Sequence, residues 1–123
     1  MENVQAEKKE ALVAAGEYLE KLIPNMGVLC QELRGNKKED TADFQNQCIN
    51  GLNWIIEIYN RTRDLLEAEK IIQDKEAFND GLIQLGSALS KQEDSKIADI
   101  LETGIIPFLE RLKTEIQKSG SGS

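Results

Sequence analysis

The side chains that could do chemistry in this sequence are mainly carboxylates, because the chain contains no histidine. Histidine is the commonest general acid–base and metal ligand, and Ser-His and Cys-His nucleophile pairs depend on it. Glu20, Glu57 and Glu102 fall near the centres of expected helices, where inward-pointing carboxylates would form a metal or small-molecule site. With 22 acids among 123 residues, such a grouping also arises by chance on a solvated surface, which is the interpretation we favour.

Motifs for phosphate and calcium binding are missing from the sequence. Neither GxxxxGK[ST] nor GxGxxG occurs. Glu93, Asp94 and Ser95 lack the alternating acids and the central glycine of a calcium loop, so they indicate the start of a helix instead. Di-metal sites in helical bundles use Glu-x-x-His, which this chain cannot supply. We therefore predict that the protein is not an enzyme and binds no cofactor.

The two cysteines, Cys30 and Cys48, fall at core-compatible positions of expected helices. In a reducing compartment, buried thiols behave as small hydrophobic side chains, and we favour this interpretation for both. A redox pair would require the two helices that carry them to be adjacent.

The charge of the chain disfavours nucleic acid and membranes as partners. Its formal net charge is −7, and the densest basic spot, Lys37-Lys38, is followed at once by Glu39-Asp40. Phosphates and anionic lipids both require a basic cluster. No apolar run approaches the ~20 residues of a membrane-spanning helix. The first twelve residues lack a signal-peptide pattern, so we expect a cytoplasmic protein.

Helical periodicity runs through the sequence. Between Val4 and Leu33, apolar residues recur at spacings of three and four and keep their phase across Pro24, which predicts one kinked helix or two nearly collinear ones. Gly35 marks its end. Three further helices are predicted, with these limits: from Asp40 or Thr41 to a break within residues 62 to 75, from 74 to 90, and from 95 to 118.

Four helices without strand signals predict an all-α fold, an antiparallel four-helix bundle (up-down-up-down) with proline-kinked first and last helices. Pro107, after Gly104, lies in the middle of the last helix. Gly81 and Gly86 in the third helix either allow a neighbour to approach closely or weaken that helix. One domain over residues 1–118 is expected, and residues 119–123 (SGSGS) are interpreted as a Gly/Ser linker or tail.

The stretch NGLNWIIEIY, residues 50–59, is apolar on more than one side of its helix. One arc is suited to the core and contains Leu52, Ile55, Ile56 and Tyr59. A second arc contains Trp54 and Ile58 and is continued by Leu65. This second arc either packs within the bundle or forms an exposed patch for self-association or for docking an amphipathic helix. Tyr18, like Tyr59, is expected in the core with its hydroxyl at the surface.

Three segments carry a resemblance to a known family: Ala98–Glu102, Ile106–Glu110 and Gly51–Ile56. Over residues 12 to 116 the chain resembles a family of small acidic all-helical bacterial proteins without an established activity, some of which are encoded near flagellar genes. The resemblance brings no catalytic residues, and it implies an adaptor or export-chaperone role by association only.

The sequence leads to three functional hypotheses. The first is a non-enzymatic bundle that binds another protein, as an adaptor or chaperone, through Trp54 and Ile58 with Leu65. The second is a structural homodimer that shares the same arc. The third, which we favour least, is the carboxylate-lined bundle that binds a metal or a small molecule.

Overall fold

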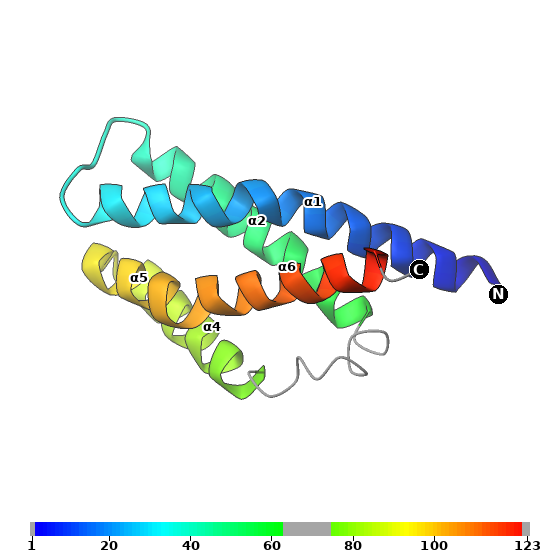
Figure 1. The fold of residues 1–123 in the computed structure, drawn as a ribbon. Helices are drawn as coiled ribbons and strands as arrows, with labels where there is room; N and C mark the ends of the chain where they lie inside the picture. Colours follow the sequence, from blue (N-terminus) through cyan, green and yellow to red (C-terminus); the bar gives the residue numbers. More distant parts are fainter. Residues whose placement is uncertain (1, 63–74, 122–123) are drawn as a thin grey trace.

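The computed structural model describes residues 2–62 and 75–121 of the chain, and every element in these ranges is helical. The elements in chain order are α1 (Glu2–Leu33), α2 (Thr41–Arg61), α4 (Lys75–Ser90), α5 (Asp94–Ile100), the π-helical segment η3 (Leu101–Ile105) and α6 (Ile106–Ser121) (Figure 1). Because α5, η3 and α6 follow one another without a break, the described residues form four helices packed together. The predicted all-α four-helix fold is confirmed.

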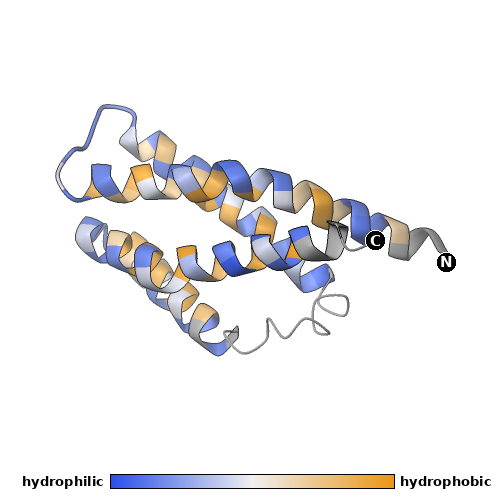
Figure 2. Cartoon of the chain, in the orientation of Figure 1, coloured by the Kyte–Doolittle hydropathy of each residue, from blue (hydrophilic) through white to orange (hydrophobic). Residues whose placement is uncertain are grey.

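The four helices alternate in direction along the chain, as Figure 1 shows. α1 packs against α2 on one flank and against α5, η3 and α6 on the other, and α4 packs against α5 and η3. Hydrophilic residues fill the exposed loop between α1 and α2 (Figure 2). None of the described helices combines the length and the apolar character that crossing a membrane requires.

Most of the core is built from the apolar stripes of the four helices. It includes leucines of α1, Leu52 and Ile55 of α2, and Leu109 of α6, all of them at most 6% exposed. An aromatic cluster joins three helices. The rings of Phe78 and Phe108 stack with centroids 3.9 Å apart, and Tyr59 meets Phe108 edge-on at 5.5 Å. This cluster links α2, α4 and α6.

The last helix accommodates Pro107 through a change of helical type. Proline lacks an N–H and its ring clashes with the carbonyl four residues earlier in an α-helix. The segment just before Ile106 and Pro107 is π-helical, with a wider turn, so the helix changes its hydrogen-bond pattern next to the proline. In contrast, Pro24 lies inside α1, which is a single helix.

The two glycines of α4 have different surroundings. A Cβ added to Gly81 would lie 3.4 Å from Cδ1 of Ile105 and 3.8 Å from the backbone of Gly104. A close approach between α4 and η3 therefore explains Gly81. Gly86 has nothing within 4 Å of such a Cβ, so no close approach explains it.

The end of α4 is closed by a residue in the left-handed region. Gln92 has φ 55°, its N–H donates to the carbonyl of Leu89 at 3.1 Å, and the N–H of Glu93 donates to that of Ala88 at 3.0 Å. These two bonds form a Schellman motif, in which glycine is the usual residue at the Gln92 position. Side chains with a Cβ are strained in this conformation.

Gln92→Gly is therefore expected to raise the free energy of unfolding by about 0.5–1 kcal/mol, because relief of strain exceeds the entropy that glycine adds to the unfolded chain. Urea denaturation followed by circular dichroism measures the change. Lys91→Gly is the matched control, since φ of Lys91 is not positive and the same substitution should destabilise there. A loss of stability in Gln92→Gly would contradict this account of the turn.

Candidate functional site

The residues predicted to form an interface do not share one surface. Trp54 is 40% exposed, whereas Ile58 is 4% exposed and belongs to the core. Leu65 lies outside the described residues. Of the two alternatives for the second arc, packing inside the bundle is the correct one for Ile58. Trp54 alone keeps an exposed indole.

Trp54 is held in place by a tyrosine from α1. The ring of Tyr18 meets the indole edge-on, with centroids 5.3 Å apart. A Cβ added to Gly51 would overlap the hydroxyl of Tyr18, so the tyrosine occupies space that any other residue at position 51 would fill. Tyr18 was expected in the core, whereas it is half-buried and packs against the outside of the core. Gly51 thus allows two aromatic rings to meet over the junction of α1 and α2.

Two hollows lie along this junction. The aromatic hollow, of about 540 Å³, is lined by Tyr18, Gln47, Asn50, Gly51 and Trp54. The acidic hollow, of about 380 Å³, is lined by Val28, Glu32, Lys38, Asp40, Asp43, Phe44 and Gln47. Gln47 borders both, so the hollows adjoin one another. We call the two together the α1–α2 seam.

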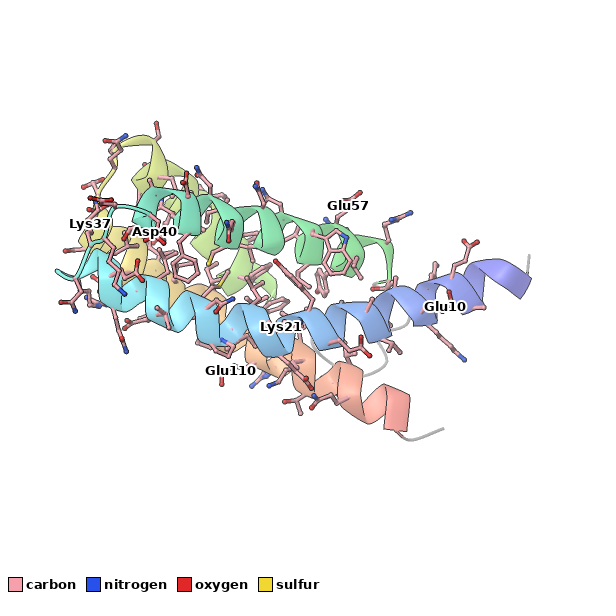
Figure 3. All side chains as sticks on the ribbon, turned by 90° about the horizontal axis from the view of Figure 1, so that it is seen from above. Glu10, Lys21, Lys37, Asp40, Glu57 and Glu110 are labelled. Atoms are coloured by element: carbon pink, nitrogen blue, oxygen red, sulfur yellow. The ribbon has the colours of Figure 1, made fainter. Side chains whose placement is uncertain are left out.

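The seam follows from the register of α2. Asp40, Asp43, Gln47, Asn50 and Trp54 stand at spacings of three, four, three and four. Such residues fall on one face of a helix, where they line up beside the neighbouring helix. In Figure 3, which looks down on α1 and α2 side by side, Asp40 lies just before the start of α2, at the connecting loop.

One end of the seam is acidic. Asp40 and Asp43 are exposed, and neither carboxylate forms an ion pair with a described residue. Glu32 is buried, and its Oε1 accepts a hydrogen bond from Oγ1 of Thr41 at 2.7 Å. Lys38 is the base among the lining residues. Carboxylates outnumber the base at this end, and the other end is lined by aromatic rings and amides.

The carboxylates considered as a metal site are not brought together. Glu102 accepts hydrogen bonds from Nη2 and Nε of Arg34, at 3.1 and 3.3 Å, and the same Nη2 donates to Asp99 at 2.7 Å. Glu20 accepts a bond from Nε2 of Gln117 at 3.2 Å. Glu57 is exposed on α2. Among the described residues, no group of three or more Cys, Asp or Glu side chains is arranged to hold a metal ion.

The Arg34 cluster joins distant parts of the chain. Its guanidinium connects the end of α1 to Asp99 of α5 and Glu102 of η3, and Nζ of Lys37 reaches Asp94 at 2.9 Å. Hydrogen bonds to Glu102 and Asp99 raise the pKa of Arg34 above its ordinary value. All of these side chains are at least one-third exposed, so the cluster positions helices and has little net effect on stability.

Both thiols are buried and free, as the favoured interpretation predicted. Burial, with smaller effects of nearby carboxylates, raises the pKa of Cys30 and of Cys48 to about 11. The S–H of Cys30 donates to the carbonyl of Ala98 at 3.7 Å. Although α1 and α2 are adjacent, the thiols are protonated at neutral pH, which makes them poor nucleophiles.

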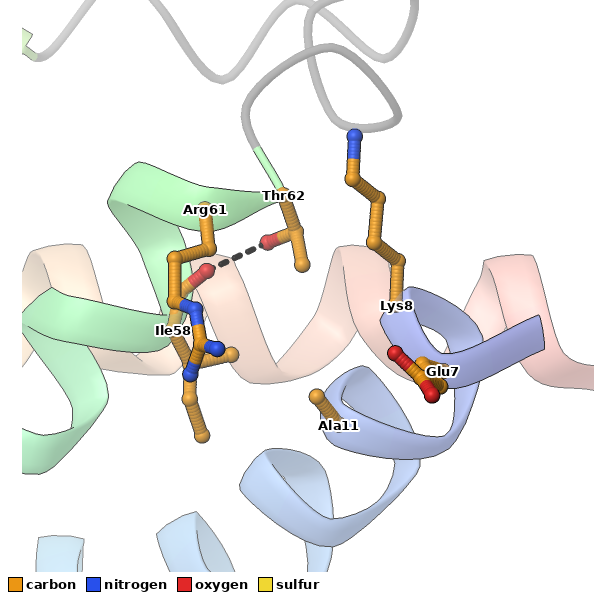
Figure 4. A pocket seen from close by; sticks show the side chains of 6 residues that line it. All are labelled: Glu7, Lys8, Ala11, Ile58, Arg61 and Thr62. Carbon is orange, nitrogen blue, oxygen red and sulfur yellow. Dashed lines mark hydrogen bonds between the residues drawn. The ribbon is translucent and has the colours of Figure 1, made fainter. Parts of the chain in front are cut away.

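A further pocket, of about 410 Å³, lies where the start of α1 meets the end of α2 (Figure 4). It is lined by Glu7, Lys8, Ala11, Ile58, Arg61 and Thr62. Oγ1 of Thr62 donates to the carbonyl of Ile58 at 2.7 Å, and this bond caps α2 rather than facing a ligand. The lining contains one acidic and two basic side chains. It contains no nucleophile with a general base beside it, so these residues do not form a recognisable catalytic site.

Comparison with known proteins places most of the chain in one family. Residues 10–115 match the family described as a domain of unknown function, DUF8042. No curated protein and no solved structure matches the chain.

Proposed function

The chain belongs to the DUF8042 family, whose description names no activity, and from the geometry of its surface we propose that it is a non-enzymatic protein-binding module. It would act as an adaptor or chaperone for another protein. The observation that carries this proposal is the exposed indole of Trp54 at the edge of an apolar hollow. Tryptophan is the side chain most enriched at the energetic centres of protein interfaces.

The arrangement around Trp54 supports the proposal. The indole is oriented by Tyr18, and a rigid aromatic anchor loses little entropy on binding. The hollow beside it is open and lined by amide side chains that both donate and accept hydrogen bonds. An apolar centre with a polar rim is the usual anatomy of a protein interface.

The resemblance to acidic bacterial proteins encoded near flagellar genes favours an adaptor or export-chaperone role, by association only. A homodimer that uses the Trp54 face is the alternative, because a second copy would cover the same indole. The carboxylate-lined metal or small-molecule bundle has no comparable support, since Glu102 is engaged by Arg34.

Trp54→Ala is expected to weaken partner binding by at least thirtyfold, because interface tryptophans typically contribute about 2 kcal/mol or more. The partner is captured on the immobilised full chain, and its affinity for each variant is then measured. Ile83→Ala is the matched control, since Ile83 is 72% exposed on α4, away from the hollow. Both variants should keep the helical circular dichroism of the unaltered protein.

Light scattering behind size exclusion, at several loading concentrations, separates the two forms of the proposal. A monomer whose captured partner is lost in Trp54→Ala supports the adaptor. A dimer that Trp54→Ala converts to a monomer supports the homodimer. Capture of the same partner by Trp54→Ala and by the unaltered chain, at equal affinity, would contradict the adaptor, and a dimer that persists in Trp54→Ala would contradict the homodimer.

A further inference from the structure

We propose that the α1–α2 seam binds an amphipathic helix with two apolar residues seven positions apart and a lysine or arginine about four positions beyond one of them. This inference rests on the proposed function and specifies the partner. Three features of the seam support it: the positions of the two hollows along α2, the side chain of Gln47 between them, and the acidic residues at one end.

Residues one heptad apart on α2 line the two hollows. Gly51, whose Cα faces the ring of Tyr18, lines the aromatic hollow, and Phe44, which lines the acidic hollow, precedes it by seven residues on the same helix. Seven residues of α-helix rise roughly 10 Å. A helix lying along the seam has the same rise, so its residues i and i+7 reach the two hollows together. Helix-in-groove recognition commonly uses such anchors.

The apolar surface available for these anchors lies in both hollows. One anchor would contact Tyr18 and Trp54, and the other would contact Val28, which is 45% exposed, and Phe44, which is half-buried. Gln47 lies between the two positions and lines both hollows. Its amide can donate to and accept from a polar residue between the two anchors of the partner.

The charge at one end of the seam indicates where the partner helix carries its lysine or arginine. Asp40 precedes Phe44 by four residues, which places it roughly 6 Å further along the axis. Asp40 and Asp43 have no described base as a partner, and the chain as a whole has a net charge of −7. A lysine or arginine at that end of the partner would be attracted to the two carboxylates, and the field of the chain would accelerate its approach.

The experiment uses a random peptide display library selected on the immobilised full chain. Enriched peptides are expected to share apolar residues seven positions apart with a base at one end. The synthesised peptides should become helical on binding and shift the emission of Trp54, the single tryptophan of the chain. Trp54→Ala should bind them at least thirtyfold more weakly.

The charge is tested with a double variant. Asp40→Asn with Asp43→Asn should weaken binding of the selected peptides about tenfold at low salt, and high salt should reduce that difference. The matched control is Glu76→Gln with Asp80→Asn, which removes two exposed acids from α4 and should leave the affinity unchanged. A peptide whose lysine or arginine is replaced by glutamate should bind the unaltered chain about tenfold more weakly than the original peptide does.

The inference is overturned if no peptide is enriched, if the enriched peptides lack the apolar pair or the base, or if they bind Trp54→Ala equally well. These outcomes are distinct from failure of the proposed function. If a partner binds through Trp54 but has no such helix, the protein-binding role is supported and the proposed partner class is wrong. A self-associating chain whose Trp54 is covered by a second copy would also reject it.

Discussion

Phe108→Ala is expected to destabilise the protein by about 3–5 kcal/mol, the usual cost of removing a buried phenylalanine. Phe108 is 4% exposed and contacts Phe78 by stacking and Tyr59 edge-on. The substitution therefore leaves a cavity where α2, α4 and α6 meet, and it removes two aromatic contacts as well. Because a domain of this size has roughly 5–15 kcal/mol of stability, the variant should be marginal. Urea denaturation followed by far-UV circular dichroism measures the loss.

Two further variants make this prediction specific. Phe44→Ala removes the same atoms from a half-buried position and should cost about half as much. If Phe108→Ala does not fold, Phe108→Leu keeps most of the apolar volume and should fold with a loss of about 1 kcal/mol. Equal losses in Phe108→Ala and Phe44→Ala would contradict the larger contribution to stability that we assign to the aromatic cluster.

Raising the pH from 9 to 11 is expected to remove several kcal/mol of stability through Cys30 and Cys48. A thiol has an ordinary pKa of 9.0, and burial raises it to about 11 in both residues. The folded state therefore holds these protons more tightly than the unfolded state. Each thiol contributes on the order of 2–3 kcal/mol, fully present below pH 9 and lost as the pH rises to 11. Denaturant unfolding at a series of pH values detects the loss.

The contribution of the thiols is isolated by comparison with Cys30→Ala/Cys48→Ala. Lysines and tyrosines titrate in the same range, but they do so in both proteins, so the difference in slope belongs to the two thiols. The double variant should be less stable at pH 8 because of the cavities it creates, yet flatter from pH 9 to 11. An equal pH dependence in the two proteins would contradict protonation of buried thiols as the cause.

Most of the fold can be predicted from the sequence because helical periodicity is a local property. The stripe of α1 continues through Pro24, Gly35 follows its end with φ 139°, and α2 begins at Thr41, one of the two predicted residues. α2 ends at Arg61, next to the break predicted within residues 62 to 75, and residues 63–74 of that range lie outside the described residues. Part of the predicted tail, residues 119–123, is helical, because α6 extends to Ser121. Whether residues 1–118 form one independent domain stays a prediction.

The candidate site depended on contacts between helices. Trp54 and Ile58 are one turn apart on α2 and differ by only about 40° around its axis, so periodicity alone cannot decide which of them is covered. The position of α1 decides it: Ile58 is enclosed in the core, while Tyr18 lies over Gly51 and leaves the indole exposed at its edge. The sequence signal for the hollow is Gly51, about one turn before Trp54, because a residue without a Cβ leaves room there for the ring of Tyr18.

Within the described residues, then, the sequence by itself determined the helices, the composition of the core and the absence of histidine chemistry. These follow from residue types and from spacings within a single helix. Only the tertiary structure decided that Arg34 engages Glu102, that Pro107 follows a π-helical segment, and that Asp40, Gln47 and Trp54 line one seam with Val28 and Tyr18. The physical reason is that exposure and pairing depend on where neighbouring helices lie, and no spacing along one helix contains that information.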